Sequence, residues 1–495
     1  MSLTTALSIA QTALFNTSRQ TSVVSSNISN ANNEDYGRRS AITSTGGNGA
    51  RIVTIQRAAN DALFRQNLAA LSSYQGQSTL LDGLNQLDLS INGSDDSTSP
   101  ATLLGQLQQA VNLYSATPSN GSLAASAIDS ATQMAQSLND GTKAIQDFRA
   151  QMDSQISAAV DKLNNLLENF DQANQAVVSG TRSGSDVSDA LDQRDSILKQ
   201  IAQYIPVSTM TRGDNDMVLT TTDGTTLYET VPRTIAFNPQ AVYTAGIPTG
   251  SAATTVAPTV GNSITIDGVP LQPGSGGNTT ASGSIAAMLQ LRDGVATTMQ
   301  SQLDEISRGL IDSFKETDPS GVGQPVPGLF TWDGAPSMPT DGTVAAGLAG
   351  SIKVNPAMDP SQPGGDATKL RDGATYDANV NGDASYSDLL IKYGQNLEQP
   401  MDFDTSAGAG AKASVLDYST NAISWLGNMR QGASTAADNK NALATKTQAA
   451  LSNATGVNMD EEMSQLLDLE HAYQASAQLM KTVNDMLNSL MAAVN

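Results

Sequence analysis

Cysteine is absent from the 495 residues of this chain, which excludes disulfides and thiol chemistry. The only histidine, His471, stands beside Tyr473 in a helical stretch, and no histidine-based dyad, triad or two-histidine zinc site can be assembled around it. Aromatic residues make up 4% of the chain and charged residues 15%. This composition suits several small domains or elongated bundles better than one large, dense core.

Long hydrophobic runs are also missing. No apolar run approaches the roughly 20 residues that a bilayer span needs, and the N-terminus shows no basic and apolar regions of a cleaved secretory signal. A net charge of −22 and a pI near 4.2 argue against nucleic acid and anionic membrane surfaces as partners. We therefore expect no membrane insertion, and either a cytosolic protein or one exported by a route that leaves the N-terminus intact.

A long heptad stripe of apolar or small residues is present at each end. The first stripe consists of Leu3, Leu7, Ala10, Leu14, Thr17, Thr21, Val24, Ile28 and Ala31. The second consists of Leu466, Leu469, Tyr473, Ala477, Met480, Val483, Leu487, Leu490 and Val494. Steps of three and four residues are typical of coiled-coil helices. Because neither stripe has a globular partner beside it in sequence, we predict that both form an assembly interface with neighbouring subunits.

Between the stripes the residue pattern changes twice. Two β-like pieces occupy 40–57, a helical pattern runs over 58–205, and from 206 short Val, Thr and Leu runs alternate with turn signals such as Asp223-Gly224. A helical pattern returns at 284–316 and again from 385 to the end. We predict a mainly α fold with a β-rich insertion, in which the terminal helices pair in a coiled-coil-like rod. The predicted domains are a terminal coiled coil (1–39 plus 456–495), a helical-bundle rod domain (40–205 plus 412–455) and a β-rich outer insertion (206–411).

Three segments resemble bacterial flagellar axial proteins. Residues 25–39, SSNISNANNEDYGRR, resemble the Asn-rich turn of that family through Asn27, Ile28, Asn30, Asn32, Tyr36 and Arg38. Residues 191–207, LDQRDSILKQIAQYIPV, are similar to a segment of the hook-associated proteins at the hook–filament junction, and they include Asp192 and Arg194. Residues 455–491, beginning TGVNMDEEM, resemble the C-terminal segment of the same family through Val457, Asn458, Asp460, Glu461, Glu462 and the run 472–477.

The resemblance implies a structural adaptor that assembles into a tubular layer, and not an enzyme. It implies export through the flagellar type III apparatus with an export chaperone, and a final location outside the cell at the tip of the hook. The partners implied are further copies of the chain, the hook protein and the second junction protein. Flagellin and the third hook-associated protein are alternatives within the same class, against which the LDQRD segment argues.

The charged residues of the motifs have structural interpretations. Asn458 is expected to cap the last helix, with Glu461 three residues on as in a capping box, and Asp460 suits the positive end of the helix dipole. Arg194, between Asp192 and Asp195, is expected to belong to an ion-pair set on a helix surface.

A calcium-loop pattern is the sharpest chemical signal in the chain. Asp377, Asn379, Asn381, Gly382 and Asp388 nearly fit the calcium-loop spacing, which leaves an extracellular, calcium-binding, adhesin-like protein as an alternative. An aspartate in place of the usual last glutamate argues against it. We predict no catalytic residue, cofactor or metal site.

Overall fold

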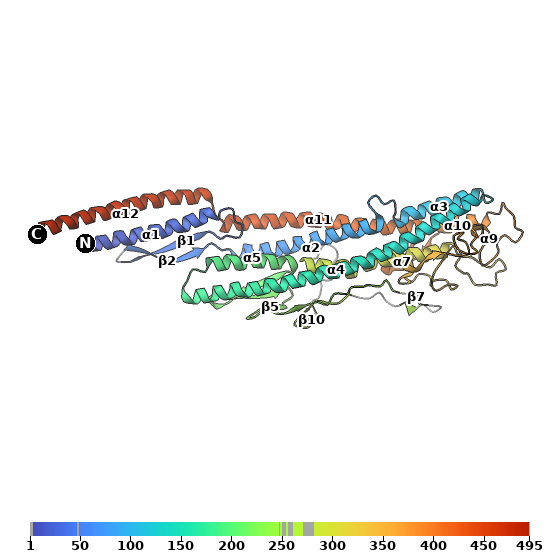
Figure 1. The fold of residues 1–495 in the computed structure, drawn as a ribbon, viewed down its shortest axis with the longest axis horizontal. Helices are drawn as coiled ribbons and strands as arrows, with labels where there is room; N and C mark the ends of the chain where they lie inside the picture. The colour runs from blue at the N-terminus through green and yellow to red at the C-terminus, as the bar shows by residue number, and fades with distance from the viewer. Residues whose placement is uncertain are drawn as a thin grey trace. The chain divides into compact units, whose positions relative to one another are not determined.

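The computed structural model describes residues 3–46, 49–246, 248–249, 254–255, 261–270 and 282–494. It confirms a mainly α fold that carries small antiparallel sheets (Figure 1). The chain divides into two compact units. Unit 1 comprises Met1–Gln75, Asp161–Ile235 and Asp438–Asn495, and unit 2 comprises Gly76–Val160 and Ala236–Ala437. The three-domain boundaries given above stay a prediction.

The ends of the chain form two helices of unit 1, α1 (Leu3–Ser29) and α12 (Met459–Val494). The helix α1 ends where asparagines and glycine favour turns, and the backbone N–H of Asn33 bonds the carbonyl of Asn30. The helix α12 is separated from α11 (Val415–Thr455) by Gly456, whose N–H bonds the carbonyl of Ser452. Asn458 caps α12, because its Oδ1 accepts from the N–H of Asp460 at 3.0 Å, as the sequence predicts.

An antiparallel hairpin follows α1 and packs on it. Its strands are β1 (Arg39–Gly46) and β2 (Gly49–Arg57), and the register pairs Arg39 with Arg57. A register shift between Ile42 and Thr43 leaves Val53 unpaired on β2. Asn16 of α1 fixes the hairpin, because its side chain donates to the carbonyl of Ala50 and accepts from the N–H of Ile52.

The rest of unit 1 is built on α5 (Ser188–Tyr204), the N-terminal part of α2 (Asp61–Asn92), the C-terminal part of α4 (Gly121–Ser183) and the end of α11. A three-stranded sheet of β3 (Val207–Thr211), β4 (Met217–Thr221) and β5 (Thr226–Tyr228) completes it. The hairpin predicted at Asp223-Gly224 is confirmed as the β4–β5 connection, with Leu219 opposite Tyr228. Tyr228 packs edge-on against Phe170 with ring centroids 5.1 Å apart.

Unit 2 is centred on α7 (Ala296–Ser313), whose apolar side chains are fully buried. The helix expected over 284–316 is divided into α6 (Ser284–Gln290), a π-helical turn at Leu291–Val295 and α7. The further helices of unit 2 are α3 (Pro100–Ala116), α8 (Leu348–Ser351), α9 (Lys369–Asp372) and α10 (Asp388–Glu398). Its strands are all two residues long: β6 (Ile235–Ala236), which begins in unit 1, β7 (Pro248–Thr249), β8 (Thr254–Thr255), β9 (Thr265–Ile266), β10 (Val269–Pro270), β11 (Phe330–Thr331), β12 (Lys353–Val354), β13 (Met401–Asp402) and β14 (Lys412–Ala413).

A buried carboxylate in unit 2 predicts a pH dependence of stability. Asp304 accepts from the N–H groups of Gly347 (2.9 Å) and Ala349 (2.8 Å), and burial raises its pKa to about 7. The folded state therefore binds this proton more tightly than the unfolded state, so the group favours folding as pH falls. We expect it to raise the free energy of unfolding by about 2 kcal/mol between pH 8 and pH 5.5.

The measurement is thermal and urea unfolding of the intact chain and of Asp304→Asn across that pH range. The amide introduced by this substitution carries no titratable proton, so the difference between the two proteins isolates the contribution of the carboxyl group. We expect the wild type to gain stability relative to the variant as pH falls. Parallel stability curves for the two proteins would contradict the prediction.

Candidate functional site

The terminal helices α1 and α12 lie side by side, as predicted, and they run antiparallel (Figure 1). A hydrogen bond of 2.9 Å from Nδ2 of Asn27, near the end of α1, to Glu462, near the start of α12, fixes their register. Counted back from this bond, Leu3 at the start of α1 lies opposite residue 486, so about the last two turns of α12 extend beyond α1. One stripe therefore faces the other along the whole length of α1.

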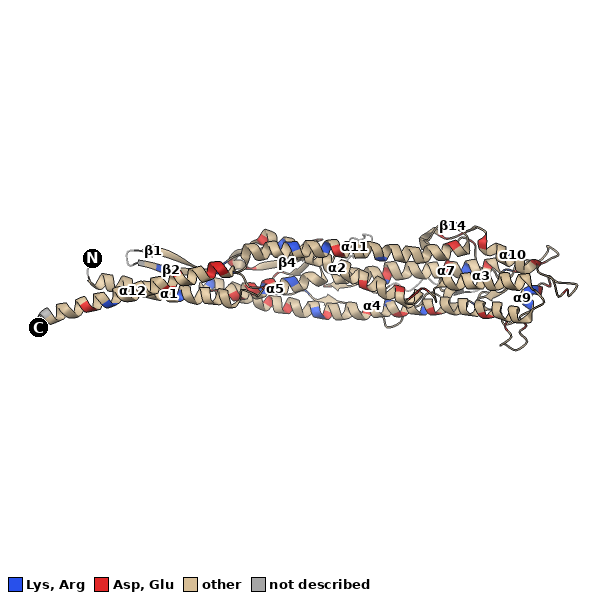
Figure 2. Cartoon of the chain, turned by 90° about the horizontal axis from the view of Figure 1, so that it is seen from above, with Lys and Arg blue, Asp and Glu red and all other residues tan. Residues whose placement is uncertain are grey.

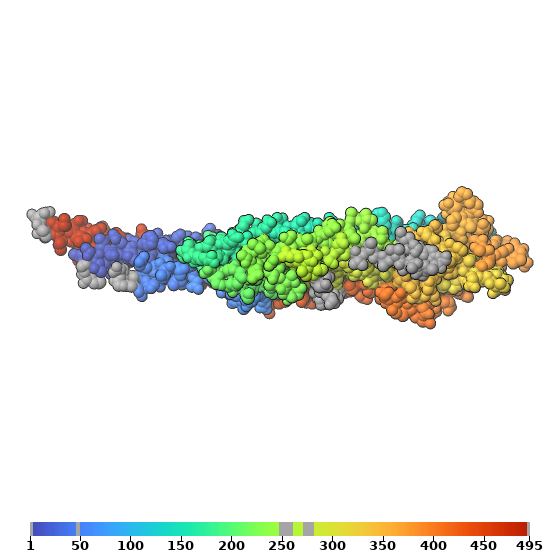
Figure 3. All heavy atoms as spheres, turned by 90° about the horizontal axis from the view of Figure 1, so that it is seen from below, coloured from blue at the N-terminus to red at the C-terminus, as the bar shows by residue number. Residues whose placement is uncertain are grey.

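The two stripes are only partly buried by this pairing. Ala10, Thr17 and Val24 of α1 are buried, and so are Leu469 and Val483 of α12. Several of the larger predicted interface residues are half-buried: Leu3, Leu7, Leu14, Ile28, Leu466, Met480 and Leu487. Tyr473 and Leu490 are 50% and 54% exposed. Apolar surface thus remains on both helices after they have packed together. In the space-filling view the end of α12, in red, lies at the surface beside α1 and the hairpin, in blue (Figure 3).

Asn27 stands at the base of the helix pair, where the three motif segments meet. Its Oδ1 accepts from the Tyr36 hydroxyl (2.8 Å) and the Arg39 N–H (3.0 Å). Its Nδ2 donates to the Arg39 carbonyl (2.9 Å) and to Glu462. Every polar atom of this buried amide therefore has a partner, and the side chain joins α1, the turn after it and α12.

Arg38 connects the same turn to the first turn of α12. Its Nε lies 2.6 Å from Oε1 of Glu462, which is fully buried, and its Nη2 lies 3.0 Å from Oε1 of Glu461, which is 59% exposed. The N–H of Arg38 also bonds the carbonyl of Thr455, the last residue of α11. Glu461 therefore pairs with Arg38 and does not complete the capping box that the sequence suggests. In Figure 2 the acidic residues at the start of α12 form the conspicuous red patch of this region.

The aspartates of the LDQRD segment hold the hairpin. Asp192 of α5 accepts from the N–H of Gly37 and lies 3.1 Å from both Arg39 and Arg57. Asp195 pairs with Arg57. Burial raises the pKa of Asp192 although the two arginines favour its charged form. These ion pairs tie β1 and β2 to α5, and through Asn27 and Arg38 to the terminal helices.

Arg194 does not belong to a surface ion-pair set, so that prediction is wrong. The side chain is 3% exposed, and its Nη1 donates to Oδ1 of Asn174 at 2.9 Å and to the carbonyl of Asn215 at 2.6 Å. Burial lowers the pKa of its guanidinium. Asp192 and Asp195 face the hairpin, whereas Arg194 faces α4 and the turn before β4. Neighbouring residues on a helix, and residues two positions apart, point to different sides, so Arg194 turns away from both aspartates.

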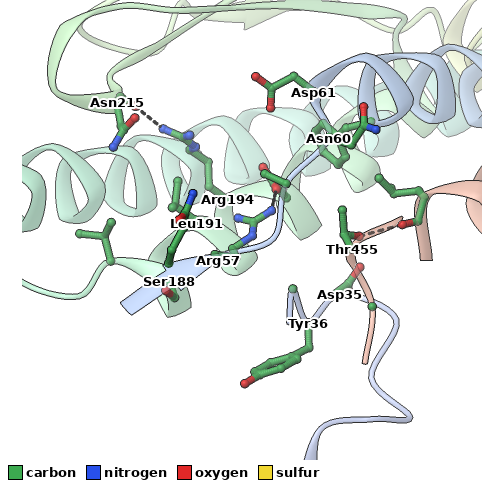
Figure 4. A pocket seen from close by; sticks show the side chains of 18 of the residues that line it. Asp35, Tyr36, Arg57, Asn60, Asp61, Ser188, Leu191, Arg194, Asn215 and Thr455 are labelled. Carbon is green, nitrogen blue, oxygen red and sulfur yellow. Dashed lines mark hydrogen bonds and ion pairs between the residues drawn. The ribbon is translucent and has the colours of Figure 1, made fainter. Parts of the chain in front are cut away.

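A polar cleft of about 870 Å³ opens beside this cluster. It is lined by the turn after α1, the starts of α2 and α5 and the end of α11, and Figure 4 shows Arg57, Arg194, Asp35 and Thr455 around it. Lys199 lies 2.8 Å from Asp35, and this contact holds the pKa of Asp35 below its usual value in spite of burial. Lys199 and Arg57 pair with aspartates, and Arg194 bonds an amide oxygen and a backbone carbonyl, so these side chains fix the backbone segments around the cleft.

Nothing in the described residues groups three or more His, Cys, Asp or Glu side chains in a way that could hold a metal ion. In the calcium-like loop, Asn379 donates to Asp372 and to the carbonyl of Asp383 and accepts from the N–H of Asp383. Asp377 accepts from the N–H of Asn379. Two residues of the calcium-loop pattern are therefore occupied in shaping the loop.

Within the same described ranges, no helix has the length and apolar character of a membrane span.

The structure brings together some of the motif residues and leaves others apart. Asn27, Tyr36, Asp192 and Glu461 meet around Arg38 and Arg39, whereas the side chain of Asn30 bonds the carbonyl of Ser26, four residues before it. Asp460 is exposed in the first turn of α12. Sequence reasoning missed Arg39, Arg57 and Glu462 as members of the cluster. Glu462 matches the family motif, and that match could have identified it as a member of the cluster. Arg57 lies outside the three motif segments, and nothing in the sequence marks it.

Comparisons with known proteins identify related families and sequences. The family model "Flagellar hook-associated protein FlgK helical domain" matches residues 84–328, and "Flagellar basal body rod FlgEFG protein C-terminal" matches 448–493. The chain is 23% identical over 529 aligned residues to flagellar hook-associated protein 1 of Bacillus subtilis, covering 98% of this chain and 96% of that protein. The protein of the same name from Escherichia coli is 22% identical over 558 residues, covering 98% and 97%.

A solved structure of the flagellar hook junction protein FlgK from Burkholderia pseudomallei aligns with 54% of this chain and 46% of its own, with a TM-score of 0.41 and 18% identity. The paired terminal helices, together with the rod-protein match over 448–493, define a flagellar axial protein. More particularly, the chain belongs to the family of flagellar hook-associated protein 1. This assignment replaces the alternatives of flagellin and the third hook-associated protein.

Proposed function

We propose that this chain is the structural adaptor that joins the flagellar hook to the filament, outside the cell. The observation that carries the proposal is the apolar surface that α1 and α12 leave uncovered, together with the rod-protein match over 448–493, which spans most of α12. Copies that meet head to tail through such surfaces build a helical tube. The match to both hook-associated proteins over 98% of this chain supports the position in the flagellum.

The proposed partners follow from this position. Further copies of the chain form one layer, the hook protein lies beneath it, and the second junction protein lies above it. Uncovered apolar helices would aggregate in the cytoplasm, so we include an export chaperone and the type III export apparatus among the partners. The role is structural, without catalysis.

The test is electron microscopy of flagella from cells with and without the gene for this chain. We expect hooks from wild-type cells to carry filaments, and hooks from the deletion strain to end bare while filament subunits accumulate in the medium. Labelling an epitope on the chain should mark a narrow band between hook and filament. Filaments of normal number in the deletion strain, or label spread along the filament, would overturn the proposal.

A further inference from the structure

The hairpin β1–β2 has an uncovered outer face. Its inner face packs on α1 through Asn16, while Ile42 and Val53 are 40% and 66% exposed on the other side. A two-stranded hairpin is marginal on its own in water, and this one packs on α1 by its inner face alone. Its exposed apolar side chains make the outer face a surface on which a partner can pack.

A matching uncovered face lies on α12, away from α1. Met463, Leu467 and Glu470 follow one another at steps of four and three residues, so they share one side of the helix. Met463 is 47% and Leu467 55% exposed, and Glu470 is exposed as well. The hairpin of the same chain leaves this side uncovered, since Met463 and Leu467 are exposed.

Charge decides which surface fits the hairpin. Residues 39–57 contain three arginines and no acidic residue; Arg39 and Arg57 pair with aspartates of α5, which leaves the exposed Arg51 for a partner. The helix α12 contains six acidic residues against Lys481, and red residues recur along it in Figure 2; Glu461 and Glu462 pair with Arg38, and Glu470 is exposed. Two hairpins meeting face to face would oppose Arg51 to Arg51, whereas a hairpin on α12 brings opposite charges together.

We propose that the outer face of the β1–β2 hairpin docks on the Met463–Leu467–Glu470 face of α12 in a second copy of this chain. Val53 then packs against Leu467, and Arg51 lies opposite Glu470. The contact joins two different surfaces, so each copy offers both and the contact repeats from copy to copy. The inference rests on the proposed assembly and specifies which surfaces meet.

The first test reverses the two charges in cells that make this chain as their sole copy. Arg51→Glu and Glu470→Arg alone are each expected to lower the amount of chain on isolated hooks about tenfold, and the double variant to restore it. Asp468→Arg is the matched control, because Asp468 is exposed on another side of α12 and should leave incorporation unchanged. Normal incorporation of both single variants, equal loss in the control, or no recovery in the double variant would overturn the docking.

The second test uses the absence of cysteine, which makes introduced thiols unambiguous. Cells that co-produce a Val53→Cys chain and a differently tagged Leu467→Cys chain should yield a cross-linked dimer that carries both tags on isolated hooks. A dimer from Val53→Cys alone would show hairpin against hairpin and overturn the inference, as would incorporated chains without a mixed dimer. If the wild-type chain is itself missing from hooks, the proposed function fails, which is a separate outcome.

Discussion

Leu487→Asp is expected to abolish incorporation of the chain into the flagellum and to leave cells without filaments. Leu487 belongs to the C-terminal stripe and is half-buried near the end of α12. An aspartate there places an unpaired charge where α1 and neighbouring copies would cover it, which costs several kcal/mol. Unit 2 lies outside the changed segment and should keep its melting behaviour. The measurements are an immunoblot of isolated hooks, a count of filaments by electron microscopy and thermal unfolding of the purified chain.

Ser489→Asp provides the matched control. Ser489 is exposed, two residues away, and its hydroxyl bonds only the carbonyl of Asp485. The control adds the same charge to the same turn without placing it in the stripe, so filaments should form in normal number. Normal filaments in Leu487→Asp would show that the stripe is not an assembly interface. Loss in both variants would show that added charge alone is responsible.

Arg38→Met is expected to destabilise the terminal helices by roughly 3 kcal/mol, because it leaves the buried carboxylate of Glu462 without its cation. Of the contacts described above, the side chain of Glu462 would then keep only the hydrogen bond from Asn27. The loss should appear as faster hydrogen exchange in the first turns of α12 and in the last turns of α1. Hydrogen exchange with mass spectrometry on the purified chain measures it by peptide.

The second partner of Arg38, Glu461, provides a control for this prediction. Glu461→Gln removes the exposed half of the contact and should cost less than about 1 kcal/mol. Glu462→Gln combined with Arg38→Met should cost less than the two single changes added together, because the two groups act on each other. Additive effects across this cycle would refute a coupled buried pair.

The long helices and the β4–β5 hairpin followed from residue pattern alone, whereas the short helices α8 and α9 were not predicted. Heptad spacing placed α1 and α12, and the Asp223-Gly224 turn placed β4 and β5, because these signals depend on neighbours within a few residues. The π turn at Leu291–Val295 was not foreseen. It lies within a continuous helical pattern, and a local change in hydrogen bonding does not disturb that pattern.

The candidate site was only partly predictable, since its members come from distant segments. Family resemblance marked Asn27, Tyr36 and Asp192 one by one, but gave no indication that they converge. Arg194 shows the limit most clearly. A local view places it among the aspartates beside it, while the fold directs it toward Asn174 and Asn215, 20 and 21 residues away.

The sequence by itself determined a mainly α chain with apolar stripes at both ends, no disulfides and membership of an axial-protein family. Only the tertiary structure decided which polar side chains meet and how much of each stripe is covered. Periodicity and composition act through residues close in sequence. The contacts from Asn27 to Glu462 and from Arg39 to Asp192 join segments 435 and 153 residues apart, and only the folded chain brings such segments together.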